Sequence, residues 1–199
     1  MNIAKNYNYQ SKFLFAAWEQ IGSPQLRSVC ECAVGPFSLL PPFKDVSTKS
    51  IYIEPSAKMA NQARINYPWA EIHQVAIAES FGKANLRNVG GSSYIKGIAW
   101  APIFTDNPER ARKAGKQRVN TVPFTAIDDG QIDILNLDCE GSEWFVLKNM
   151  ISRPILIQIE HRIENPFAKE IDEWFKSNNY YELSRWQHGA VNIIYHQNI

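Results

Sequence analysis

The sequence predicts an α/β fold in which a mostly parallel β-sheet has helices on both faces. Short apolar runs bounded by turn residues alternate with segments whose hydrophobic side chains recur at helical spacing, and this alternation is typical of βαβ units. The chain has 199 residues, of which 45% are hydrophobic and 21% are charged, as expected for one domain with a sizeable core. No repeat, linker or low-complexity tract interrupts it. We therefore expect a single domain over residues 1–199.

Helices are expected where hydrophobic side chains recur with a 3.6-residue period next to a capping or breaking residue. The first such pattern ends at Gly22, and Ser56 is placed to cap the second. In the last of them, Ile171 and Phe175 fall on one face. A helix or a helical turn is also expected after the turn at Gly35–Pro36. The expected helices cover residues 8–21, 56–66, 142–150 and 165–179.

Strands are expected at the apolar runs between these helices. No clear period marks residues 100–118, and a turn is expected at Asp128–Gly130. The expected strands cover 29–34, 50–55, 70–77, 119–127, 131–138, 153–160, 180–186 and 190–196, with shorter strands or loop edges at 82–89 and 92–97. The last two of the longer runs are expected to pair antiparallel. The chain then divides into an N-terminal helix over 1–22, a motif-bearing core over 29–162, and a C-terminal helix and strand pair over 165–199.

Composition and charge narrow the classes of function. A net charge of +1 argues against a protein whose main partner is nucleic acid or an acidic membrane. The three cysteines, Cys30, Cys32 and Cys139, form no C-x-x-C pair, and no H-E-x-x-H motif occurs, so a structural zinc site is not expected. No run approaches the ~20 apolar residues of a membrane helix, and residues 1–12 lack the apolar run of a signal peptide. We expect a cytoplasmic protein with reduced cysteines.

Carboxylates stand at the ends of three expected strands. They are Glu31, Glu54 and the group around Asp138. In an open α/β sheet, ligands bind outside the carboxyl ends of the strands. One such acid could serve only the N-terminus of the following helix, but three in one βαβ chain indicate a binding site.

The turn after the first strand, E-C-A-V-G-P-F, does not fit a dinucleotide-binding fingerprint. G-x-G-x-x-G brings backbone N–H groups to a pyrophosphate, whereas this turn has Ala33, Gly35 and Ser38 at those positions, and Pro36 lacks the N–H. The acid at Glu31 also suits a pyrophosphate poorly. S-adenosylmethionine (SAM) has no phosphate and carries a sulfonium, an ammonium group and a ribose diol. Small residues in the turn let it approach the backbone, and a carboxylate suits its positive end.

The second strand adds a partner for the ribose. Glu54 lies 23 residues after Glu31, at the end of that strand. A carboxylate at this position can accept hydrogen bonds from both ribose hydroxyls. The pair of acids therefore favours a nucleoside-containing ligand.

The stretch IDILNLDCEGSEWFVLKNM, residues 132–150, resembles the signature of the FkbM family of SAM-dependent methyltransferases. In that family a strand of the form D-x-L-K-I-D runs into D-x-E-G-x-E and then into a helix that ends in x-V-L-K. The matching residues are Asp138, Glu140, Gly141, Glu143, Val146, Leu147 and Lys148.

Flanking pieces occur in the family's order. IYIEPS, VAIAESFGKANL, TVPFTAIDD and QIEHR resemble its second-strand E-P, its A-I-G-D-x-x-G-x-A-x-L stretch, its T-L-D-D turn and its E-x-H strand end. The resemblance spans residues 29–162. It departs from the family at Ala33, where the first glycine of D-x-G-A-N-x-G would stand, and at Asn136, where the family has lysine.

The resemblance implies a Rossmann-like class I methyltransferase fold, SAM as the methyl donor, and O-methylation of a sugar, a glycan or a similar small acceptor. No N-P-P-Y-like motif ends the 131–138 strand, which weakens an amine- or base-methylating interpretation. A nucleotide-dependent oxidoreductase and a non-catalytic SAM-binding or nucleotide-binding module on the same scaffold remain alternatives. Together with the residues above, the resemblance places the cofactor contacts at Glu31, Ala33, Gly35, Glu54, Pro55, Ala76, Ile77 and Asp138.

Asp138 is the expected catalytic residue, as a base or an orienting acceptor for the hydroxyl. Glu140 is expected to shape the acceptor pocket, and His161 to be the alternative base. Glu143, in the first turn of a helix, is expected to be structural. A cluster of carboxylates with a histidine could also hold a divalent metal, but we do not favour one, because no ligand spacing enforces it.

The run ERARKAGKQR, residues 109–118, holds five basic residues. Such a run is most often a solvated face, which is the favoured interpretation here. The alternative is a substrate loop that attracts a phosphorylated or acidic acceptor. The sequence does not set the oligomeric state.

Overall fold

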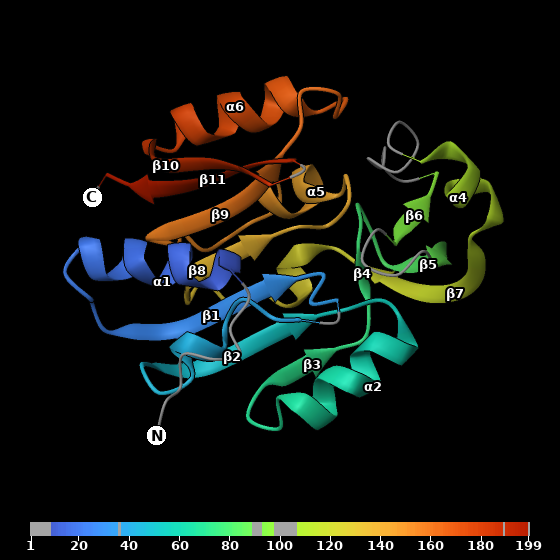
Figure 1. Cartoon of the computed structure of the whole chain (residues 1–199), viewed down its shortest axis with the longest axis horizontal. Helices are drawn as coiled ribbons and strands as arrows, with labels where there is room; N and C mark the ends of the chain where they lie inside the picture. The colour runs from blue at the N-terminus through green and yellow to red at the C-terminus, as the bar shows by residue number, and fades with distance from the viewer. Residues whose placement is uncertain (1–8, 36, 89–92, 98–106, 189, 199) are drawn as a thin grey trace.

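The computed structural model describes residues 9–35, 37–88, 93–97, 107–188 and 190–198. A seven-stranded sheet in the order β10-β11-β9-β8-β1-β2-β3 forms the main body, and a four-stranded sheet in the order β4-β7-β5-β6 stands at one end of it (Figure 1). The strands are β1 Leu26–Cys32, β2 Ser47–Ile53, β3 Glu71–His73, β4 Ala76–Ile77, β5 Gly82–Asn88, β6 Tyr94–Lys96, β7 Gly115–Val122, β8 Ile132–Leu137, β9 Leu156–His161, β10 Tyr180–His188 and β11 Ala190–Gln197. The α-helices are α1 Tyr9–Gln20, α2 Ala57–Asn66, α4 Pro108–Lys113, α5 Glu143–Leu147 and α6 Ala168–Ser177.

The main sheet is parallel except at one edge. β3, β2, β1, β8 and β9 run parallel, whereas β11 runs antiparallel to β9 and forms a hairpin with β10. All six residues of β8 are buried, as expected for a parallel strand that is covered on both faces and therefore forms a continuous apolar run. The expected mostly parallel α/β sheet with an antiparallel C-terminal pair is confirmed.

Two hydrophobic clusters cover the two faces of this sheet. One contains Phe145 of α5 and Phe175 of α6, and the other contains Leu14 and Trp18 of α1 together with Ala63 of α2. Helices therefore lie on both faces, as expected. Among the described residues, no helix is long and apolar enough to cross a membrane.

The predicted strand over 70–77 is wrong in one respect, because the structure divides it between the two sheets. β3 pairs in parallel with β2 in the main sheet, and β4 pairs in parallel with β7 in the second sheet. Gln74 and Val75 lie between them without strand geometry. This split carries the chain from the edge of the main sheet into the second sheet.

The second sheet accounts for the segments that had no clear sequence period. β7 pairs antiparallel with β5, which pairs antiparallel with β6. The unassigned run over 100–118 contributes α4 and the first four residues of β7, so β7 begins at Gly115 rather than Val119. Residues 98–106 and Pro36 lie outside the described part of the chain.

The helix or helical turn expected after β1 is present as a short 3₁₀ helix, Pro41–Phe43, in which two successive prolines supply no N–H groups. Two other local predictions need correction. Helix α5 has five residues rather than the nine expected from 142–150. Ser56 stands at the N-cap of α2, but its side chain makes no capping hydrogen bond.

A buried carboxylate anchors the turn that leads into β8. Asp128 is 2% exposed and accepts hydrogen bonds from the backbone N–H groups of Gly130 at 3.0 Å, Ile151 at 2.6 Å and Ser152 at 2.8 Å, and from the Ser152 hydroxyl. The Ser152 hydroxyl oxygen in turn accepts from the N–H of Ile132. The side chain thus joins the segments that precede β8 and β9.

We expect Asp128→Ala to lower the free energy of unfolding by ~3 kcal/mol, because several buried donors lose a charged acceptor at once. Asp129→Ala is the matched control. Asp129 is the exposed neighbour and accepts one hydrogen bond, from the N–H of Gln131, so its loss should cost under ~0.5 kcal/mol. Urea unfolding followed by circular dichroism measures both. Equal stability of the two variants would contradict the anchoring role.

Candidate active site

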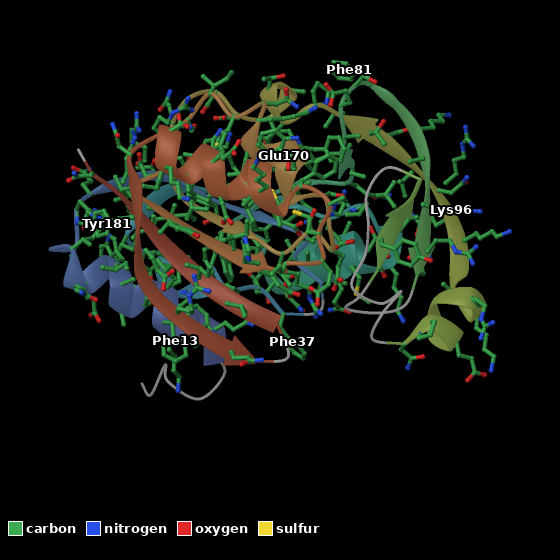
Figure 2. All side chains as sticks on the ribbon, turned by 90° about the horizontal axis from the view of Figure 1, so that it is seen from above. Phe13, Phe37, Phe81, Lys96, Glu170 and Tyr181 are labelled. Atoms are coloured by element: carbon green, nitrogen blue, oxygen red, sulfur yellow. The ribbon has the colours of Figure 1, made fainter. Side chains whose placement is uncertain are left out.

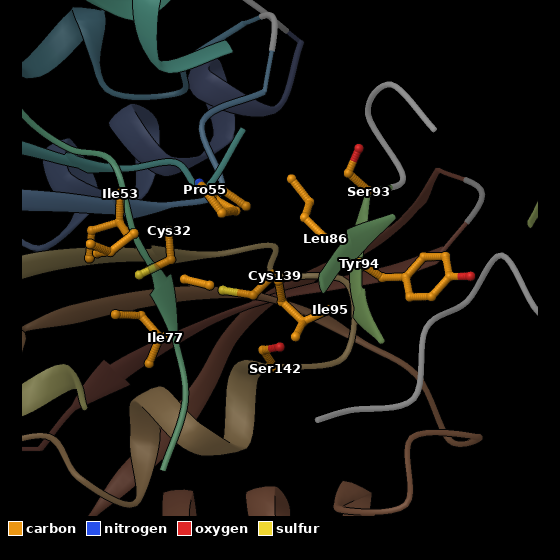
Figure 3. A pocket seen from close by; sticks show the side chains of 13 residues that line it. Cys32, Ile53, Pro55, Ile77, Leu86, Ser93, Tyr94, Ile95, Cys139 and Ser142 are labelled. Atoms are coloured by element: carbon orange, nitrogen blue, oxygen red, sulfur yellow. The ribbon is translucent and has the colours of Figure 1, made fainter. Parts of the chain in front are cut away.

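A pocket lies where the carboxyl ends of β1 and β2 meet the second sheet (Figure 3). Four of the predicted cofactor residues line it: Ala33, Pro55, Ala76 and Ile77. Cys139, which follows β8, also lines it. We call it the edge pocket. The strand order of the main sheet brings these residues together although they lie far apart in the sequence.

The opposite wall of the edge pocket belongs to the second sheet. Leu86 of β5 and Tyr94 and Ile95 of β6 line it, on the side opposite Ile53 and Pro55 (Figure 3). Sequence reasoning did not assign these residues to the site. The signal available in the sequence was the alternation of apolar Ala84 and Leu86 with polar residues in β5. Such alternation indicates a strand with one covered face, and the structure shows Ala84 and Leu86 buried.

Ala33 marks the departure from the family's usual glycine. Its φ is +67°, in the left-handed region that glycine adopts at little cost. The chain therefore makes the turn that the glycine would make, but with a methyl group at the pocket wall. Gly35, two residues later, also has a positive φ of +55°.

Glu54 ties together the loops that follow β1 and β2. Its carboxylate accepts hydrogen bonds from the N–H of Gly35 at 3.0 Å and from the N–H of Ser56 at 2.7 Å. Burial raises the pKa of Glu54, and the two N–H donors oppose that shift. Glu54 thus lies between Pro55 and the β1 loop, at the rim of the edge pocket.

Glu31 points away from the edge pocket, into the interior beneath the β1 loop. Its carboxylate accepts hydrogen bonds from the Ser38 hydroxyl, from the Leu39 N–H at 3.1 Å and from the Asn136 side-chain amide at 3.2 Å. Burial raises its pKa to about 7. The structure therefore shows Glu31 holding the loop, and a direct contact with the positive end of a ligand stays a prediction. Asn136, at the position of the family's lysine, is part of this arrangement.

The turn after β8 is built around Glu143. Its carboxylate accepts hydrogen bonds from the N–H groups of Cys139 at 2.8 Å and Gly141 at 3.2 Å, and from the Asn165 side chain at 3.2 Å. Burial raises its pKa to about 7. Glu140 and Gly141 have φ values of +52° and +99°, so the chain reverses sharply between Asp138 and α5. Glu143 therefore has a structural role in this turn.

Asp138 lies beside Glu160 of β9, and this second carboxyl disfavours the ionised form of Asp138. Burial, followed by the negative charges of Glu160, Glu140 and Glu143, raises the pKa of Asp138 well above the ordinary carboxyl range. Glu160 also accepts a hydrogen bond from the Arg162 guanidinium at 2.8 Å. Sequence reasoning did not assign Glu160 or Arg162 to the site. The register of β8 and β9, which pairs Leu137 with Ile159, brings the next residues of the two strands together.

His161 contacts α6. Its Nε2 atom lies 3.1 Å from Oδ1 of Asp172. Because side chains alternate along a strand, His161 and Glu160 leave β9 toward opposite faces of the sheet. His161 and Arg162 line a second pocket together with Asp172, Arg185 and Gln187, which we call the polar pocket.

Among the residues that the structure describes, no three or more His, Cys, Asp or Glu side chains are grouped so as to hold a metal ion. Cys30, Cys32 and Cys139 are free thiols. The neighbouring thiols of Cys139 and Cys30, followed by burial, raise the pKa of Cys32, so it is a poor nucleophile near neutral pH. Asp138, with Glu160 beside it, and Glu54 are therefore the carboxyl groups at this edge whose pKa values are raised and that we consider as candidates for chemistry.

Solved structures share this fold. A methyltransferase FkbM from Methylobacillus flagellatus KT superposes with a TM-score of 0.56 at 14% identity, over 86% of this chain and 44% of that protein. The N-methyltransferase NodS from Bradyrhizobium japonicum gives 0.54 at 6% identity, over 96% and 95%. The magnesium protoporphyrin IX methyltransferase from Synechocystis, solved with bound SAM, gives 0.50 at 9% identity, over 99% and 88%. At these identities the likeness shows the fold alone.

The family assignment comes from the sequence comparison. No curated protein matches this chain. The methyltransferase FkbM domain matches residues 34–181, which include both sides of the edge pocket, the Glu143 turn and the Asp138–Glu160 pair. The fold is that of class I methyltransferases. The chain therefore belongs to the FkbM family of methyltransferases.

Proposed function

We propose that this chain transfers a methyl group from SAM to a hydroxyl of a sugar, a glycan or a similar small acceptor, in a reducing cytoplasm. The observation that carries the proposal is the place of Asp138. It precedes Cys139, which lines the edge pocket, and it is linked through Glu160 and Arg162 to the polar pocket. Asp138 itself lines neither pocket; we propose that its carboxylate accepts the proton at the edge pocket, which suits the methyl donor, while the polar pocket binds the acceptor.

The edge pocket has the features that SAM requires. Its walls are small or apolar at Ala33, Ile53 and Ile77, which suits an adenine ring. Glu54 is fixed at the rim by two N–H groups and keeps further lone pairs for a ribose diol. The bound cofactor would supply a methyl group on a positively charged sulfur.

The residues of the chain would contribute positioning and a proton acceptor. As the bond between the acceptor oxygen and the methyl carbon forms and the bond from sulfur to that carbon breaks, the hydroxyl proton passes to the Asp138 carboxylate. Glu160 orients Asp138, and Arg162 keeps a positive charge next to the pair. The raised pKa makes Asp138 a stronger base than an exposed aspartate.

The polar pocket suits an acceptor rich in hydroxyl groups. Arg185 and Gln187 supply donors, Asp172 supplies acceptors, and Val191 gives an apolar surface. His161 lies in this pocket on Asp172, so we propose that it binds the acceptor rather than replacing Asp138 as the base. Glu140, in the sharp turn next to Asp138, is still proposed to shape the acceptor pocket.

Two other functions predict different measurements. A nucleotide-dependent oxidoreductase would bind NAD, for which the β1 loop lacks the glycine pattern. A non-catalytic module on this scaffold would bind SAM and never transfer a methyl group. Calorimetry with SAM and NAD, followed by a methyl-transfer screen over sugars and glycan fragments, separates the three.

We expect Asp138→Asn to keep SAM affinity and to lower kcat by ~10²-fold or more, the usual weight of a positioned acid–base group. The substitution keeps the shape of the side chain and removes its ability to take the proton. Transfer of radiolabelled methyl and calorimetry with SAM measure the two quantities. Asp129→Asn, at an exposed site, is the control for the loss of one charge. Near-wild-type turnover of Asp138→Asn would exclude the role, and activity lost in EDTA and restored by Mg²⁺ would assign the acids to a metal.

The pH dependence should report the carboxyl pair. Asp138 must be ionised to accept a proton, so kcat/KM should rise with pH through a pKa above the ordinary carboxyl range. Glu160→Gln removes the negative charge next to Asp138, stabilises its ionised form and should move this limb of the profile toward lower pH. A limb that stays in place would show that Glu160 does not act on the base.

We expect Glu54→Ala to weaken SAM binding by ~1.5–3 kcal/mol, the scale of a hydrogen-bonding charged group. Glu71→Ala is the matched control, because Glu71 is an exposed carboxylate on the neighbouring strand β3 that pairs with Lys49. Calorimetry with SAM measures the affinity. Circular dichroism checks that the substitution, which releases the β1 loop, has not unfolded the chain. Unchanged affinity in a folded variant would remove Glu54 from the cofactor site.

A further inference from the structure

The outer face of the second sheet concentrates positive charge. Five basic side chains point from it: Lys83, Arg87, Lys96, Lys116 and Arg118, which we call the basic face. Figure 2 shows Lys96 projecting from the end of the molecule that this sheet forms. The net charge of the whole chain is only +1, so this concentration is local.

Strand alternation produces the basic face. In β5, Lys83, Asn85 and Arg87 are exposed or half-buried, whereas Ala84 and Leu86 between them are buried. The pairing then places Arg118 and Lys96 on either side of Asn85, and Lys116 opposite Arg87. Because partners across strands lie on the same face, all five basic residues share one surface.

The opposite surface of the same strands lines the edge pocket. Leu86 of β5 and Ile95 of β6 point into it. The basic face and the edge pocket are therefore two sides of one thin sheet. A ligand on the basic face would be held outside the pocket, next to the short strand β6.

Within the part of the chain that the structure describes, no carboxylate neutralises the positive charges of the basic face, although the Arg87 guanidinium donates a hydrogen bond to the Arg112 carbonyl at 3.4 Å. No Asp or Glu occurs within β5, β6 or β7, and none of the five basic side chains forms an ion pair with a described residue. Arg87 and Lys116 stand directly opposite each other, and like charges in that position destabilise a sheet. A bound polyanion would relieve this repulsion.

The other groups on this surface favour an acidic polysaccharide over other polyanions. Asn85 and Asn120 stand exposed among the cations and offer both donors and acceptors to sugar hydroxyls. Within these strands the aromatic residue is Tyr94, which is 4% exposed, but Phe81, directly before β5, is 72% exposed and offers a ring that can stack on a sugar or on a base. No exposed residue of the three strands is apolar, as membrane insertion would require.

We propose that the basic face binds an acidic polysaccharide, the chain that carries the acceptor hydroxyl. The proposal rests on the methyltransferase function above and adds the charge and the polymeric nature of its acceptor. It also gives different roles to the basic residues of the 109–118 run, which the sequence analysis treated as one group. Lys116 and Arg118 belong to this face, whereas Lys113 is paired with Glu109 at 2.6 Å within α4.

Binding without SAM tests the proposal. Polygalacturonate oligomers, neutral dextran of equal length, a single-stranded oligonucleotide and phosphatidylglycerol vesicles are offered to the full chain. The wild type should bind polygalacturonate in preference to the other three, and more weakly as salt rises, because salt screens exposed charges over ~8 Å at physiological ionic strength. Preference for the oligonucleotide or the vesicles, or equal binding of dextran, would overturn the choice of partner.

A triple variant locates the binding. Lys83→Gln, Lys96→Gln and Lys116→Gln together should weaken polygalacturonate binding by about tenfold, since each exposed charge contributes up to ~1 kcal/mol. The matched control, Lys12→Gln, Lys58→Gln and Lys176→Gln, removes three exposed lysines from helices of the main body and should bind as the wild type does. Equal loss in both variants, or in neither, would contradict the proposal.

The outcome is separable from that of the proposed function. A chain that binds polygalacturonate through this face but transfers no methyl group to any acceptor would exclude the methyltransferase proposal and keep the polyanion site. A chain that methylates neutral sugars, with the triple variant equal to the wild type in KM for acidic oligomers, would keep the enzyme and exclude the basic face as its acceptor site.

Discussion

Buried carboxylates that accept hydrogen bonds from backbone N–H groups hold the loops at the carboxyl edge of the main sheet. Glu31 holds the loop after β1, Glu54 joins that loop to the start of α2, and Glu143 holds the turn after β8. Burial costs each of them desolvation, which the N–H donors offset in part. Because these loops are fixed by the protein itself, the edge pocket is formed before any ligand binds. Such preorganisation is what a reaction governed by positioning requires.

The raised pKa values near this edge follow from the same arrangement. A carboxylate that anchors a loop must be buried, and several buried carboxylates within a few residues of one another raise each other's pKa. Asp138 is the member of the group that is paired with another carboxyl instead of with loop N–H groups. The structural acids around it therefore help to make it basic. Structure and proposed chemistry are coupled through charge at this point.

Strand alternation explains how the small second sheet takes part in two surfaces. Its buried side chains close the edge pocket, and its exposed side chains form the basic face. A small four-stranded sheet needs one covered face to be stable, and the carboxyl edge of the main sheet provides the cover. The other face is free to carry charge that the main body could not accommodate in its core.

Local pattern was sufficient for most of the fold and part of the site. The apolar run that became β8, the helical period of α6 and the turn at Asp128–Gly130 each depend on neighbouring residues, so they could be recognised one segment at a time. The β3–β4 break was missed, since residues 70–77 form one short run without a turn residue and only the pairing partners of its two halves differ. The helix predicted over 142–150 was longer than α5. The turn at Gly141 and the end of the helix depend on contacts with Asn165 and the rest of the fold, which the local pattern does not contain.

The sequence by itself determined the family and the alternation of strands and helices, because motifs and periodicity are local properties. The strand order of the folded sheets brought Ala33, Pro55 and Ile77 together. Tertiary structure alone decided which way the acids point. It turned Glu31 inward onto Asn136, paired Asp138 with a glutamate 22 residues further along, and sent His161 to α6. Side-chain direction at a strand end depends on register and on what packs above each face, and these are set by residues far away in the chain.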